Sequence, residues 1–104
     1  MSTTVDYIEY VCEQIGEEYD VRCRKMFGDY MVYVNDKPVI LVCDNCVYVK
    51  KIKELNKLME NSESGFPYCG AKEHYILDIE DAKLVDSVVE ILEKFTPKRR
   101  VKKK

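Results

Sequence analysis

Residues 30–50 decide the fold, and they read YMVYVNDKPVILVCDNCVYVK. Two polar dipeptides, Asn35-Asp36 and Asp44-Asn45, separate three short apolar stretches. Asn and Asp tolerate the positive φ angles of a two-residue hairpin turn better than most other residues that carry a side chain. The segment therefore predicts three antiparallel strands, at 30–34, 38–43 and 46–50, joined by two tight hairpins.

Two-residue loops also predict which residues oppose each other across the hairpins. The predicted pairs are Val34 with Lys37, Val32 with Val39, Tyr30 with Leu41, Leu41 with Tyr48, and Cys43 with Cys46. One face then carries Tyr30, Val32, Val34, Val39, Leu41, Cys43, Cys46 and Tyr48, and the other carries Met31, Tyr33, Ile40, Val42, Val47 and Val49. Both faces are apolar, whereas a sheet with one solvated face should alternate apolar and polar residues. We therefore expect that helices cover both faces or that one face binds another chain.

Apolar periodicity predicts the elements around these strands. Helical spacing covers 4–16, 52–61 and a last segment, from about Leu84, that ends before Pro97. Period-two alternation starts a strand at Val21, and Tyr75 to Ile79 reads as a fifth strand. This order predicts an α+β fold. We expect a two-layer domain with a largely antiparallel sheet of about five strands and helices at its N-terminus, middle and C-terminus.

Length and charge divide the chain into a domain and a tail. The 104 residues fit one domain, which we place at 1–97, followed by a basic segment at 98–104 that we expect to be disordered. Six of the 17 Lys and Arg lie in that tail, so the other eleven oppose 19 Asp and Glu and the body carries about −8. Since an acidic body is a poor nucleic-acid surface, we expect weak nucleic-acid contact only through the tail. The tail cations are Lys98, Arg99, Arg100, Lys102, Lys103 and Lys104; the alternative is a solubilising tail without a fixed partner.

The sequence predicts a cytoplasmic location and no membrane partner. The longest unbroken apolar run, Val39 to Cys43, is far shorter than the roughly 20 residues that span a bilayer. The first residues, Met1 to Asp6, have neither the basic nor the apolar region of a secretory signal, so we expect none. In that compartment the five cysteines should be mostly reduced.

Several motifs resemble the N-terminal domain of the TfoX/Sxy family of bacterial competence regulators. They are Met26-Phe27-Gly28, then Tyr33, an apolar strand, and Tyr48-Val49-Lys50. The family reads Met-Phe-Gly-Gly, a Tyr, a turn, an apolar strand, a turn and Tyr-Leu-Lys. Phe66-Pro67-Tyr68 looks like its aromatic-proline loop, so the resemblance covers residues 4–96. Asp29 replaces the second glycine, and Ile79-Glu80 stands where the family has a proline.

The resemblance implies a secretion-chaperone-like fold and a non-enzymatic regulatory or protein-interaction module, associated in that family with transcriptional control of competence. It implies that Met26, Phe27, Gly28, Tyr33, Tyr48 and Lys50 shape a surface or core. Phe27 should fill the core, Gly28 should permit a tight turn, and the charge of Lys50 most needs a functional explanation. Because aromatic residues are enriched at interfaces, we expect the second apolar face to bind a protein partner or to form a homodimer.

Cys43 and Cys46 have the spacing of half a structural zinc site. Cys69 and His74 could complete a Cys₃His set, which gives a zinc-stabilised binding domain as an alternative reading. The competing interpretation is that the two cysteines are cross-strand neighbours of a hairpin without a cofactor. A disulfide between them is sterically conceivable, but a reducing cytosol opposes it.

Cys69 and His74 could also be a nucleophile and its base. The sequence offers no group to orient the histidine, no oxyanion motif and no phosphate-binding glycine loop. We therefore expect that the protein is not an enzyme.

Overall fold

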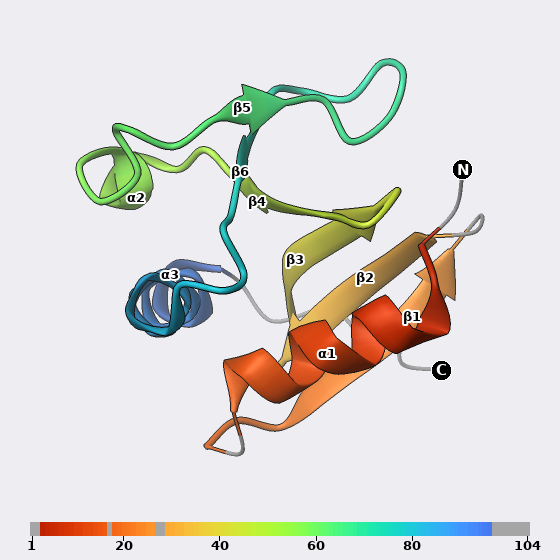
Figure 1. Cartoon of the computed structure of the whole chain (residues 1–104). Helices are drawn as coiled ribbons and strands as arrows, with labels where there is room; N and C mark the ends of the chain where they lie inside the picture. Colours follow the sequence, from red (N-terminus) through yellow and green to blue (C-terminus); the bar gives the residue numbers. More distant parts are fainter. Residues whose placement is uncertain (1–2, 17, 27–28, 97–104) are drawn as a thin grey trace, which may run out of the picture.

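Six strands form one antiparallel sheet (Figure 1). The computed structural model describes residues 3–16, 18–26 and 29–96. In spatial order, the strands are β1 (Val21–Met26), β2 (Asp29–Val34), β3 (Lys37–Cys43), β4 (Cys46–Lys50), β6 (His74–Ile76) and β5 (Ser64–Gly65). The helices are α1 (Val5–Ile15), α2 (Lys53–Asn56) and α3 (Ala82–Phe95). The predicted α+β fold is confirmed, with β5 as a strand that the sequence did not reveal.

Both predicted hairpin turns form. Asn35 and Asp36 have φ angles of 53° and 68°, and Asp44 and Asn45 have 52° and 57°. These left-handed conformations are those that Asn and Asp side chains tolerate best among residues with a Cβ. The turns join β2 to β3 and β3 to β4, as the dipeptides predicted.

The pairing of β2 with β3 differs from the prediction because the strands contain a bulge. The register shifts between Val32 and Tyr33, so Val32 opposes Ile40 instead of Val39. Beyond the bulge Tyr30 opposes Val42 instead of Leu41. An extra residue in one strand exchanges the faces of all residues beyond it. The predicted pairs Val34 with Lys37, Leu41 with Tyr48, and Cys43 with Cys46 are confirmed.

Burial explains why the bulge is favourable. The exposed fractions of Val39 and Ile40 are 4% and 1%, so both neighbouring side chains are buried, which a regular strand would not allow. Ile40 and Val42 thereby share the face of Val32, and Leu41 moves to the opposite face. The two predicted faces were therefore wrong for the part of β3 beyond the bulge and for β4, which pairs with it: Val47 lies on the face of Val32, and Tyr48 lies on the opposite face.

Helices α1 and α3 cover one face of the sheet and pack against each other (Figure 1). Thr4 caps α1 by accepting a hydrogen bond from the Tyr7 N–H (3.2 Å), and Asp81 caps α3 by accepting one from the Leu84 N–H (3.2 Å). In the core, apolar side chains of both helices pack against alternate residues of the strands. Its members include Ile8, Val11, Ile15, Val32, Val34, Ile40, Val42, Val47, Val49, Val85, Val88, Val89 and Leu92. The opposite face of β2, β3 and β4 lies outside this helix layer.

Two further predictions need correction. The middle helix spans Lys53–Asn56 instead of 52–61, and Leu58, which lies beyond its end, is 40% exposed. The late strand ends at Ile76, because a turn at Asp78 to Asp81 begins the approach to α3. The predicted tail and its boundary lie outside the described residues.

None of the helices in the part of the chain that the structure describes is long and apolar enough to cross a membrane.

Candidate functional site

The sheet face opposite α1 and α3, termed here the uncovered face, gathers aromatic and basic side chains. Strand register places one row across it: Arg24, Met31, Leu41, Tyr48 and Ile76. The neighbouring row carries Arg22 and Tyr33 toward the β1 edge of the sheet, and Lys50 and His74 toward the β6 edge. These side chains are half-buried or exposed, while the neighbours of Met31, Leu41 and Tyr48 along β2, β3 and β4 are in the core. The second apolar face therefore exists, but it also carries cations.

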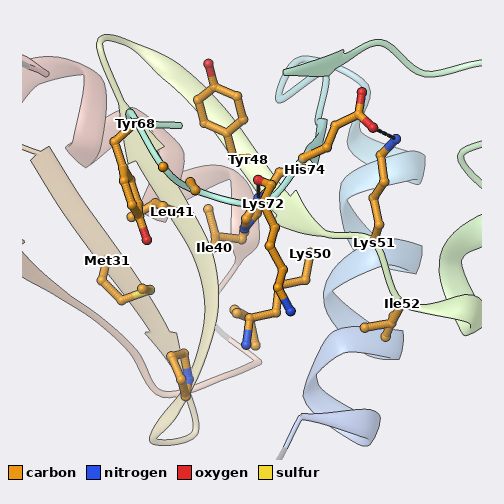
Figure 2. A pocket seen from close by; sticks show the side chains of 15 residues that line it. Met31, Ile40, Leu41, Tyr48, Lys50, Lys51, Ile52, Tyr68, Lys72 and His74 are labelled. Atoms are coloured by element: carbon orange, nitrogen blue, oxygen red, sulfur yellow. Dashed lines mark hydrogen bonds and ion pairs between the residues drawn. The ribbon is translucent and has the colours of Figure 1, made fainter. Parts of the chain in front are cut away.

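A pocket of about 630 Å³ lies on the uncovered face. Strands β3 and β4 form its floor through Leu41 and Tyr48, and the loop after β5 contributes Tyr68 and Lys72. Figure 2 shows the Tyr68 side chain reaching from this loop toward Leu41 and Met31. The volume lies within the range of pockets that hold small ligands, roughly 300–1,000 Å³.

Three lysines line the pocket, and two of them are uncompensated. The ammonium of Lys51 pairs with Glu73 at 3.1 Å and lies 4.9 Å from the centre of the Tyr75 ring. Lys50 and Lys72 form no ion pair among the residues that the structure describes. Figure 2 shows their side chains running toward the same end of the pocket. That end therefore favours an anionic group.

His74 and Tyr48 add oriented polar groups to the same pocket. Nδ1 of His74 lies 2.7 Å from the Lys72 carbonyl oxygen. A carbonyl can only accept, so Nδ1 carries the proton and Nε2 remains for a ligand. The His74 and Tyr48 rings meet edge to face, with centroids 6.5 Å apart. Burial, with Cys46 beside the hydroxyl, raises the pKa of Tyr48, which keeps this group a neutral phenol that can donate a hydrogen bond.

The structure brings together three residues of the motif that suggested the TfoX family. Tyr33, Tyr48 and Lys50 all lie on the uncovered face, and the last two line the pocket. Met26 is the last residue of β1. Phe27 and Gly28 lie outside the described residues, as do the tail cations Lys98, Arg99, Arg100, Lys102, Lys103 and Lys104.

The candidate zinc ligands are not assembled. Among the described residues, which include all four, no group of three or more Cys, His, Asp or Glu side chains could hold a metal ion. Cys43 and Cys46 oppose each other at one end of β4, and His74 opposes Lys50 at the other end, about 13 Å along the strand. Cys69 lies exposed in the loop, and no hydrogen bond joins it to His74 within the described part. Neither the Cys₃His set nor the Cys–His catalytic pair is formed.

Sequence reasoning missed four contributors to the site. Tyr68 was noted as part of the aromatic-proline loop, but it is 60% exposed at the pocket. The alternation of Arg22 and Arg24 with Cys23 could have placed both arginines opposite the helix layer. Lys72 lies in an irregular loop, so no periodicity in the sequence could locate it.

A comparison of sequences gives one relative. The chain is 38% identical over 78 residues to an uncharacterized 12.7 kDa protein in the trpE 5' region of Spirochaeta aurantia, a match that covers 75% of this chain and 68% of the relative. The chain belongs to the family of that protein. No model of a known protein family matches the sequence, and no solved structure matches it. Since the relative is itself described as uncharacterized, the function must be argued from the site.

Proposed function

We propose that this protein is a non-enzymatic regulatory module that binds a partner through the uncovered face of its sheet. The observation that carries the proposal is the pocket on that face, where Lys50 and Lys72 remain without ion pairs in the described part while the protein body is acidic overall. Such a surface selects a partner that presents negative charge next to apolar or aromatic groups.

The resemblance to the TfoX N-terminal domain supports the same reading. Tyr33, Tyr48 and Lys50, which carry that resemblance, lie on the uncovered face and not in the helix-covered core. Under this proposal they shape a binding surface, and a role in transcriptional regulation would follow from what is bound there. The five cysteines, all free in the structure, fit a reducing compartment, and we propose the cytoplasm as the site of action.

Site-specific photo-crosslinking in living cells tests the proposal. A benzophenone amino acid replaces Tyr68, which is 60% exposed on the uncovered face. The matched control replaces Phe95 of α3, which is 50% exposed and belongs to the helix layer. We expect a discrete crosslinked product from position 68 and none from position 95.

Charge reversal then links the product to the pocket. Lys50→Glu and Lys72→Glu should each reduce crosslinking from position 68 several-fold, while Lys83→Glu on the exposed side of α3 should leave it unchanged. The proposal would be contradicted by crosslinked products from position 95 alone. It would also be contradicted if the crosslinking yield from position 68 were unchanged in both lysine variants. The chemical class of the captured partner is not part of this test.

A further inference from the structure

A second hollow lies at the other side of the uncovered face. It has a volume of about 250 Å³ and is lined by Arg22, Arg24, Tyr33 and Asp36, with Cys23 at its edge. The large pocket pairs Tyr48 and Tyr68 with Lys50 and Lys72. Each hollow therefore combines tyrosine with at least two cations. The combination recurs across the sheet, from strands β1 and β2 to strands β3 and β4.

The two hollows are separated by a distance that suits a chain molecule. From β1 to β4 there are three steps between neighbouring strands, each about 4.8 Å, so the cations at the two sides lie roughly 14 Å apart across the sheet. Met31 and Leu41 lie between them and provide an apolar surface. A small ligand fills one hollow, whereas an extended polymer with a repeating unit reaches both.

Acidic groups among the described residues of this face offset only part of its positive charge. Asp20 pairs with Arg22 at 3.3 Å, and Glu73 pairs with Lys51. Asp36 also lines the smaller hollow. Arg24, Lys50 and Lys72 form no ion pair within the described residues. Three cations thus remain for an anionic chain.

We infer that the uncovered face binds single-stranded nucleic acid, with bases stacked on its tyrosines and phosphates held by Arg24, Lys50 and Lys72. This inference rests on the proposed function, since it names the partner of the same face. A repeated pairing of aromatic rings with cations is the pattern by which proteins bind single strands, because every nucleotide carries both a π-face and a phosphate. An acidic peptide would use the cations and leave the exposed ring of Tyr68 without a matching group.

The inference places nucleic-acid binding on a structured surface and not in the basic tail. The body is acidic, so long-range repulsion weakens the approach of a polyanion, and binding should be strongest at low salt. Tail and face are distinguishable, because tail contacts involve charge alone whereas the face also stacks bases.

Fluorescence anisotropy with the full chain tests the inference. The probe is a labelled oligouridylate of about twelve nucleotides, titrated over a series of salt concentrations. Lys50→Gln and Lys72→Gln should each flatten the slope of log K against log salt by about 0.7. Tyr68→Ala should weaken binding by about tenfold without changing that slope. Lys83→Gln and Phe95→Ala, both on α3, are the matched controls and should leave binding unchanged.

Four results would overturn the inference. They are no binding at low salt, equal affinity for an oligoglutamate of matched charge, equal affinity for uridine monophosphate, and loss of binding only when the six tail cations are replaced by glutamine. The proposed function is judged separately. If crosslinking from position 68 captures a protein and no nucleic acid, the proposed function stands and this inference fails. Urea unfolding of each variant confirms that it is folded.

Discussion

Single residues explain why the two hairpins form where they do. Asn35 adopts a positive φ angle in the first turn. Its side-chain oxygen accepts a hydrogen bond from the Asp20 N–H at 3.0 Å, and its side-chain amide donates one to the Glu93 carboxylate at 3.3 Å. The same residue therefore forms the turn and joins it to α3. Asn45 accepts the Thr4 N–H at 3.1 Å and connects the second turn to the start of α1. Both turns are fixed by local conformational preference and then by contacts distant in sequence.

Cys43 shows how environment decides the chemistry of a residue. Burial of the thiol and the carboxylate of Asp29 beside it raise the pKa of Cys43 to about 11. The thiolate is both the metal ligand and the nucleophile, so this environment disfavours either role near neutral pH. Cys69, by contrast, is exposed in the loop beside the pocket.

We predict that Cys43 is alkylated slowly in the folded protein. At pH 8 a thiol with a pKa near 11 is thiolate in about one molecule in a thousand. Iodoacetamide followed by peptide mass mapping should therefore label Cys69 at least tenfold faster than Cys43, and labelling of Cys43 should accelerate as the pH rises toward 11. In urea the two should react at similar rates. Equal rates in the folded state would show that Cys43 is neither buried nor protonated as described.

At the scale of elements, the bulge between β2 and β3 determines which side chains form the site. Without it, Leu41 would share the face of Val32, and Ile40 would lie on the opposite face. With it, Ile40 is 1% exposed under the helices and Leu41 lines the pocket. The bulge therefore sorts Ile40 and Val42 into the core and Leu41 onto the uncovered face.

Two truncations test that sorting. Ile40→Ala should lower the free energy of unfolding by about 2–5 kcal/mol, because it leaves a cavity in the core. Leu41→Ala should cost about 1 kcal/mol, because this side chain is only half-buried on the uncovered face. Chemical denaturation of the two variants measures the difference. A larger loss for Leu41→Ala would mean that the strand pairs in the regular register.

At the scale of the whole molecule, charge is segregated. The body as a whole is acidic, yet Arg24, Lys50 and Lys72 lie together on the one sheet face that no helix of the described part covers. A homodimer formed through two uncovered faces would bring these cations of both copies against each other, which is unfavourable once water is excluded.

We therefore predict a monomer in dilute solution when no anionic partner is present. Native mass spectrometry of the untagged protein, purified under reducing conditions without chelator, measures stoichiometry and bound metal in one spectrum. A dimer of the unmodified protein in dilute solution would contradict the charge argument and favour the predicted self-association. A mass increment of the size of zinc that disappears in Cys43→Ser would restore the metal reading.

The sequence by itself determined the α+β fold, both hairpin turns, the positions of α1 and α3, and the start of the middle helix but not its end. These depend on local preferences, since Asn-Asp and Asp-Asn turns, capping residues and apolar periodicity act within a few residues. It also indicated a second apolar sheet face, for which we expected either a helix cover or contact with another chain. Three of the residues on that face, Tyr33, Tyr48 and Lys50, were named from the motif alone.

Only the tertiary structure decided the register of β3, the exposure of Tyr68 and the contribution of Lys72. The bulge forms because burying both Val39 and Ile40 is favourable only once α1 and α3 are packed on the sheet. Lys72 lies far along the chain from Lys50, and a loop with no periodicity brings it to the pocket. A site formed by distant segments depends on how those segments pack, and no local pattern encodes that.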